Sequence, residues 1–147
     1  MIEIRAVTDP AGKVVAPEWL NRAEGVHRQL RTQLPGDYVG RMRVVFTGGG
    51  RMFVAMAGDD VVGVAVYRVL ENTNDGRKFY VDDLVTDETK RSTGVGHALM
   101  QALEIEARRL DCDMLALDSG TQRTAAHKFY FREGMTIASF HFKKPLR

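Results

Sequence analysis

The chain has 147 residues, of which 44% are hydrophobic and 27% charged. This length and composition are typical of one globular domain, residues 1–147, with enough apolar side chains to form a core. The formal net charge of +2 is too small to indicate nucleic acid or an anionic membrane as a partner. A single cysteine excludes an internal disulfide, and the sequence has neither a transmembrane run nor a signal-peptide pattern, so we expect a cytoplasmic protein.

The first half of the chain predicts a strand, two helices and a hairpin. Pro17 is well placed in the first turn of a helix, and Trp19, Ala23, Val26 and Leu30 follow it at helical spacing. The second strand of the hairpin is apolar on both faces, which is typical of a central strand that is covered from both sides. The predicted elements are strand 2–7, helices 17–30 and 37–46, and strands 52–57 and 61–69.

The second half predicts strands and helices in alternation. β-Branched and aromatic residues indicate the strands, and Gly134 is expected to end the last helix. The full order is β-α-α-β-β-β-α-β-α-β, and a meander followed by β-α-β implies an α/β (α+β) fold with a mixed sheet and helices on both faces. The predicted elements are strand 79–86, helix 95–110, strand 114–117, helix 124–132 and strand 137–142.

The turn between the strand at 79–86 and the helix at 95–110 carries the first functional signal. Its two glycines let the backbone come close to a ligand, and the first helical turn offers unpaired N–H groups at the positive end of the helix dipole. This combination is typical of a phosphate-binding site, to which the Arg91 side chain could add a charge. The amide donors would come from Arg91, Ser92, Thr93, Gly94, Val95 and Gly96.

Three known kinds of phosphate site contain a glycine turn and can be compared with this sequence. A P-loop requires Gly-Lys followed by Ser or Thr, and the turn has no such triplet. A dinucleotide fingerprint requires a third small residue where Leu99 stands, and the hairpin upstream disfavours a Rossmann unit. The pattern Arg/Gln-x-x-Gly-x-Gly/Ala matches residues 91–96. Binding of a nucleotide such as ATP or NAD in the same turn is kept as a further alternative.

A second motif lies downstream, where residues 126–135 match Ala-x-x-x-Tyr-x-x-x-Gly-Met. With both motifs at this distance, and with this order of elements, the chain resembles the GNAT (Gcn5-related N-acetyltransferase) superfamily over nearly its whole length. The resemblance implies a mostly antiparallel sheet of six or seven strands. It also implies an acyltransferase with acetyl-CoA as cosubstrate. Separately, the histidines do not have the spacing of metal ligands, so no metal site is expected.

The resemblance also implies roles for individual residues of this chain. The amides of residues 91–96 would bind the diphosphate of coenzyme A, and Tyr130 would lie near the sulfur and act as the acid for the leaving thiolate. Arg123 stands where the family often has an asparagine, and it could reach the phosphates or merely cap a helix. The strand edge that would pair with the pantetheine amides consists of Leu84, Val85 and Thr86.

Asp82 and Asp83 are candidates for the acceptor side of the reaction. An amine with a pKa of about 10.4 must lose a proton before it attacks a thioester, and a carboxylate could hold the ammonium and act as the base. Neighbours on a strand point to opposite faces, so only one of the two is expected to face the acceptor unless a bulge changes the alternation. The family often has an acidic residue at the position of Asp82. Together with Glu71, the two aspartates hint at a cationic acceptor.

These inferences together define the expected function. The protein would move an acetyl group from acetyl-CoA to a primary amine of a small molecule or peptide, by direct attack in a ternary complex. The alternative is a non-catalytic module of the same fold that binds acyl-CoA and senses it. The chain could also form a homodimer in which the last strand, 137–142, is paired or exchanged across the interface.

Overall fold

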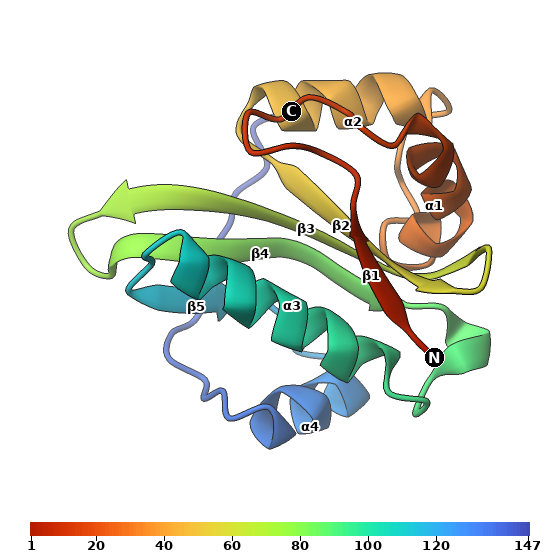
Figure 1. Cartoon of the computed structure of the whole chain (residues 1–147). Coiled ribbons are helices and arrows are strands. Elements are labelled where there is room, and N and C mark those ends of the chain that lie inside the picture. The colour runs from red at the N-terminus through yellow and green to blue at the C-terminus, as the bar shows by residue number, and fades with distance from the viewer. The chain divides into compact units, whose positions relative to one another are not determined.

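Figure 1 shows the elements of the computed structural model, which describes residues 1–147. Five strands form one sheet in their order along the chain, and the first four strands pair antiparallel with one another. None of the helices combines the length and the apolar character that crossing a bilayer requires. The elements are β1 (Glu3–Ala6), α1 (Pro17–Leu30), α2 (Tyr38–Thr47), β2 (Arg51–Ala57), β3 (Asp60–Asn72), β4 (Gly76–Thr86), the 3-10 helix η1 (Glu88–Lys90), α3 (Val95–Arg109), β5 (Met114–Leu117) and α4 (Thr124–Arg132).

The predicted order of elements is confirmed from the first strand to the last helix, and the fold is α+β with a mixed sheet. The prediction of six or seven strands is wrong, because the sheet has five. The expected strand at 137–142 is not formed: residues 135–147 contain no helix or strand, and Ile137, Phe140 and Phe142 are exposed. A strand forms only where another backbone satisfies its N–H and C=O groups, and side chains with strand propensity do not supply that partner.

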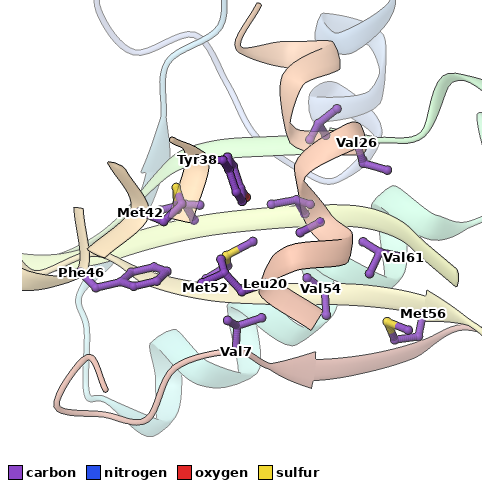
Figure 2. Packing of buried hydrophobic residues seen from close by; sticks show 14 residues of the cluster. Val7, Leu20, Val26, Tyr38, Met42, Phe46, Met52, Val54, Met56 and Val61 are labelled. Atoms are coloured by element: carbon purple, nitrogen blue, oxygen red, sulfur yellow. The ribbon is translucent and has the colours of Figure 1, made fainter. Parts of the chain in front are cut away.

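The chain divides into two compact units, Met1–Ala116 and Leu117–Arg147, and each is described by itself. In the first unit, α1 and α2 lie over one face of the sheet and α3 lies over the other (Figure 1). Figure 2 shows how the apolar side chains under α1 and α2 fill the space between these helices and the strands. The buried members of this core are Val7, Leu20, Ala23, Val26, Tyr38, Met42, Phe46, Met52, Val54, Met56, Val61, Val64, Val66 and Val85.

Local signals fix where α1 and α2 begin. Pro17 occupies the first turn of α1, where its missing N–H removes no helical hydrogen bond. The Asp37 carboxylate accepts a hydrogen bond of 2.9 Å from the Gly40 amide and so caps α2. Because Leu20 and Val26 of α1 are buried against the sheet, the loop that follows the helix lies beside β3 and β4.

β3 is the central strand of the sheet, as its apolar sequence predicts, and residues 61–67 are all buried. Gly63 faces α3, and a Cβ at this position would lie 2.8 Å from both Val95 Cγ1 and Leu99 Cδ1. Real side chains do not come that close, so the glycine permits the short distance between helix and strand. The start of α3 at Val95 is therefore held against the sheet.

β4 contains a bulge opposite β3. Val66 pairs with Asp83 and Tyr67 pairs with Val81, which leaves Asp82 as an extra residue. Before the bulge, the odd-numbered residues of β4 lie on the same face of the sheet as Tyr67. After the bulge, the odd-numbered residues of β4 lie on the same face as Val66, which belongs to the core under α1. The bulge therefore changes which face of the sheet the residues of β4 present.

Candidate functional site

A cavity of about 660 Å³ lies between the loop after α1, helix α2 and the strands β3 and β4. Its volume is within the range that small-molecule sites occupy. Leu30, Leu34, Met42, Val45 and Val66 supply apolar surface. The ionisable groups in the lining are His27, Arg31, Arg41, Arg68, Asp82 and Asp83. We call this space the acceptor cavity.

The bulge brings the two predicted aspartates to the acceptor cavity together. Alternation along a regular strand would place them on opposite faces, and the bulge is the exception that the sequence left open. Asp82, the extra residue, and Asp83, which follows it, both line the cavity. The Asp82 carbonyl accepts a hydrogen bond of 2.9 Å from Arg31 Nη2, so a side chain satisfies this backbone group at the bulge.

Asp83 is held in place from two sides. His27 Nε2 lies 2.7 Å from Asp83 Oδ2, and the Arg31 guanidinium lies 2.6 Å from Asp83 Oδ1. Burial alone would raise the pKa of Asp83, but the His27 hydrogen bond, the His27 charge and Arg31 together hold the pKa below its ordinary value. Asp83 is therefore an ionised and fixed carboxylate.

Asp82 has a single charged partner and the opposite pKa shift. Arg68 Nε donates a hydrogen bond of 2.7 Å to Asp82 Oδ2, and Arg68 Nη1 donates one of 3.2 Å to the Gly48 carbonyl. Burial raises the pKa of Asp82, and the hydrogen bond and charge of Arg68 offset this only in part. A carboxylate with a raised pKa is the better proton acceptor of the pair.

His27 and Tyr38 form a buried extension of the Asp83 group. Tyr38 Oη lies 2.8 Å from His27 Nδ1, and the two rings meet edge to face with centroids 5.6 Å apart. Because an ionised carboxylate only accepts hydrogen bonds, Nε2 carries the proton that is donated to Asp83. Burial raises the pKa of Tyr38, so it stays a phenol, and the protonation of the imidazole sets which of Tyr38 Oη and His27 Nδ1 is the donor.

The sequence did not point to His27, Tyr38, Arg31 or Arg68 as site residues. A signal for His27 was present, because it follows Val26 on the face of α1 that carries the apolar stripe, and a polar residue there must find a buried partner. The arginines gave no such signal. Their role depends on contacts with β4: Arg68 contacts Asp82, 14 positions away, and Arg31 contacts Asp83, 52 positions away.

The turn at 91–96 presents main-chain donors at an exposed site. Ser92 and Gly94 both have positive φ, of 63° and 91°, and residues 91–94 are exposed. Gly94 is the N-cap of α3, and no side chain caps this 15-residue helix. The first-turn amides are thus not taken up by a capping side chain, which leaves them as donors that a phosphate group could accept from.

The residues of the predicted strand edge lie at the end of β4, which is an interior strand of the sheet, with β3 and β5 as its neighbours. Leu84 and Thr86 are half-buried, whereas Val85 is buried in the core under α1. The Val85 side chain is therefore structural. Thr86 pairs with Gly63 of β3 and precedes η1, which leads into the turn at 91–96.

Tyr130 and Arg123 belong to the second unit, on and just before α4. Burial raises the pKa of Tyr130, and the charge and hydrogen bond of Arg123 offset this in part. Tyr130 meets the Phe129 ring edge to face, with centroids 5.5 Å apart. His127 Nε2 lies 2.8 Å from the Gly120 carbonyl, so it links α4 to the loop before it. Arg123 occupies the N-cap position but makes no side-chain capping hydrogen bond.

Comparisons with known proteins agree with this fold. The sequence model of the Acetyltransferase (GNAT) family matches residues 17–135. N-acetyltransferase YhdJ of Bacillus subtilis (strain 168) is 32% identical over 123 residues, which cover 80% of this chain and 85% of that protein. An aminoalkylphosphonate N-acetyltransferase of Salmonella typhimurium is 33% identical over 66 residues, which cover 45% of this chain and 43% of that protein.

Among solved structures, AAC(6')-Iy in complex with the bisubstrate analog CoA-S-monomethyl-acetylneamine has a similar fold. Its TM-score is 0.82 at 17% identity, and the match covers 100% of this chain and 99% of that one. The family match defines the class as acetyltransferases, and the fold agrees with it. The chain belongs to the acetyltransferase (GNAT) family and is an N-acetyltransferase.

Proposed function

We propose that the protein transfers an acetyl group from acetyl-CoA to a primary amine of a small molecule or peptide, by direct attack of the amine while both substrates are bound. The observation that carries this proposal is the bulge of β4, which turns Asp82 and Asp83 toward one cavity. The same strand leads through η1 into the uncapped turn of α3. We also propose that residues 1–147 act as one domain, since the family match runs through both compact units.

The turn and the strand edge are the proposed site for acetyl-CoA. The backbone amides of residues 91–96 would donate to the diphosphate, and the Arg91 side chain would add a positive charge. The backbone of residues 84–86 would pair with the pantetheine amides, as an added strand does at a sheet edge. Arg123 of the second unit is a further candidate for the phosphates.

Asp82 is the proposed base for the acceptor amine. At pH 7 a lysine-like amine with a pKa of about 10.4 lies about 3.4 pH units, or roughly 4.6 kcal/mol, from its neutral form. A carboxylate whose pKa is raised by burial takes up this proton more readily, directly or through a water molecule. Asp83 is tied to His27 and Arg31, and its proposed role is to orient the amine.

Tyr130 is the proposed acid for the leaving thiolate. A tyrosine is protonated at neutral pH, and burial raises the pKa of Tyr130 further. A phenol is a weaker acid than a thiol, so its main effect would be a hydrogen bond that stabilises the thiolate as it leaves. The proposal for Tyr130 rests on the family pattern at residues 126–135 and on this pKa direction.

The relative and the structural neighbour do not decide the acceptor, because their names point to molecules that differ in charge. The Salmonella relative is named for aminoalkylphosphonates, which combine an amine with an anionic group. The AAC(6')-Iy complex contains an acetylneamine group, and that enzyme is named as an aminoglycoside N-acetyltransferase. Aminoglycosides carry several amines and are polycationic. The charge of the acceptor cavity is therefore the observation that can distinguish the two kinds of acceptor.

Release of coenzyme A thiol from acetyl-CoA, measured with a panel of amines, tests the proposed function. Turnover with at least one amine is expected, and Tyr130→Phe should lower kcat much more than it weakens acetyl-CoA binding, which calorimetry measures. Acetyl-CoA binding without thiol release from any amine would instead support an acyl-CoA sensor. Tighter binding of ATP or NAD than of acetyl-CoA would point to a nucleotide-binding protein.

The homodimer and the cytoplasmic location stay predictions from the sequence. Sedimentation of the full chain, compared with a chain truncated after residue 136, tests whether the exposed segment 137–142 takes part in association. A dimer that survives the truncation would exclude this segment as the contact.

A further inference from the structure

The acceptor cavity contains more positive than negative charge. Three guanidinium groups and two carboxylates line it, which leaves an excess of one positive charge (three minus two) even when the histidine is neutral. A concave site with an excess of one sign attracts ligands of the other sign. The charged groups are Arg31, Arg41, Arg68, Asp82 and Asp83.

Both carboxylates in the cavity already have a cationic partner. Asp83 lies 2.6 Å from the Arg31 guanidinium, and Asp82 lies 2.7 Å from Arg68 Nε. A polycationic ligand that bound these carboxylates would have to displace the guanidinium groups or lie beside them, where like charges repel each other. Glu71, the third acidic residue of the sequence-based hint, is paired with Arg77. The hint of a cationic acceptor is therefore not supported by the way these carboxylates are paired.

The arginines keep donors that no protein group uses. Arg31 donates through Nε and Nη2, and Arg68 donates through Nε and Nη1. A guanidinium has five N–H donors, so Nη1 of Arg31 and Nη2 of Arg68 remain available. Arg41 is exposed on α2, and its side chain forms no ion pair with the protein. Paired guanidinium donors match the oxygen atoms of a phosphonate, phosphate or carboxylate.

From this arrangement we infer that the acceptor is a small primary amine that also carries an anionic group. Arg31, Arg41 and Arg68 hold the phosphonate, phosphate or carboxylate of this molecule, and its amine lies at Asp82. The inference rests on the proposed function and specifies its substrate class. The cavity volume of about 660 Å³ admits a molecule of this size.

Four amines of matched length test the inference in the thiol-release assay. Aminopropylphosphonate and γ-aminobutyrate carry an anionic group, propylamine carries none, and diaminopropane carries a second cation. For at least one of the two anionic amines, we expect a kcat/KM about tenfold or more above the values for propylamine and diaminopropane. The phosphonate and the carboxylate arms show which anion fits best. Neamine adds a polycationic comparison.

Arg41→Gln supplies the residue-level test. It should raise KM for the anionic amine about tenfold, and by a larger factor than it changes KM for propylamine. Arg43→Gln is the matched control, because Arg43 is exposed on the same helix but does not line the cavity. Equal effects of Arg41→Gln on anionic and uncharged amines would overturn the inference.

Two further outcomes separate the inference from the proposed function. A kcat/KM for propylamine, diaminopropane or neamine at or above those of both anionic amines would overturn the inference and leave the acetyltransferase function intact. If no amine releases thiol, titration of the labelled protein with aminopropylphosphonate and γ-aminobutyrate still decides the inference. Amide NMR shifts in residues 27–34 and 82–83, weakened by Arg41→Gln, would support it, and their absence would reject it.

Discussion

His27 Nε2 lies 2.7 Å from Asp83 Oδ2, although 56 positions separate the two residues along the chain. The contact ties the buried face of α1 to the bulged part of β4, and Tyr38 of α2 extends it on the far side of the imidazole. His27 is almost fully buried, so this hydrogen bond is shielded from water. The hydrogen-bonded side chains of Tyr38, His27 and Asp83 thus connect α2 and α1 to β4 at the acceptor cavity.

Replacing His27 should destabilise the fold more than replacing Tyr38 by phenylalanine. His27→Ala leaves a cavity, leaves Tyr38 Oη without its partner and removes one support of Asp83, for an expected loss of about 2–4 kcal/mol. Tyr38→Phe removes one hydrogen bond and should cost about 1 kcal/mol. Denaturant unfolding of both variants measures the difference. Equal losses would mean that the His27–Asp83 contact contributes little.

Asp82→Asn should lower turnover and change its pH dependence. Removal of a general base typically costs about 10²–10⁴-fold in rate. Because the pKa of Asp82 is raised, the wild-type rate should fall on the acidic side as Asp82 takes up a proton, and Asp82→Asn should lack this acid limb. Asp75→Asn is the control, since it removes a half-buried ion pair, the one with Lys78 in the same hairpin, outside the acceptor cavity. An acid limb that persists in Asp82→Asn would assign the base elsewhere.

Asp83 should make the fold sensitive to acid. Its pKa is lowered in the folded state, so the unfolded chain binds the proton more readily and stability rises with pH in this range. The contribution is complete above the unfolded value of about 3.9 and is lost as pH falls through the lower folded pKa. Asp83→Asn should therefore lose less stability than the wild type between about pH 6 and about pH 2. Unfolding midpoints across this range test it, and parallel curves would contradict the pKa direction.

Gly94→Ala should weaken acetyl-CoA binding. Gly94 has a φ of 91°, which strains an L side chain by roughly 1–2 kcal/mol, although a Cβ there meets no protein atom within 4 Å. Gly58→Ala is a matched control, because Gly58 also has positive φ with open space around it, in the turn between β2 and β3. Both variants should lose similar stability, but only Gly94→Ala should raise the Kd for acetyl-CoA. Equal Kd values would place the diphosphate away from this turn.

Much of the fold could be predicted because its signals are local. The bounds of β5 and α4 agree with the sequence prediction. Pro17 marks the start of α1 through its missing N–H, and Asp37 marks the start of α2 through its carboxylate. The segment at 137–142 shows the limit of such signals. Ile137, Phe140 and Phe142 favour a strand, but they remain exposed without strand pairing, because a strand depends on a partner that its own residues do not encode.

The amino-acid sequence by itself determined the order of elements, the glycine turn and the two motifs that point to acetyl-CoA, because each depends on residues close together in the chain. Only the tertiary structure decided that Asp82 and Asp83 share one cavity, that their pKa values shift in opposite directions, and that arginines outnumber the carboxylates there. These properties come from the register of β4 against β3 and from contacts with α1, and electrostatic energies depend on distances and burial that only the folded chain defines.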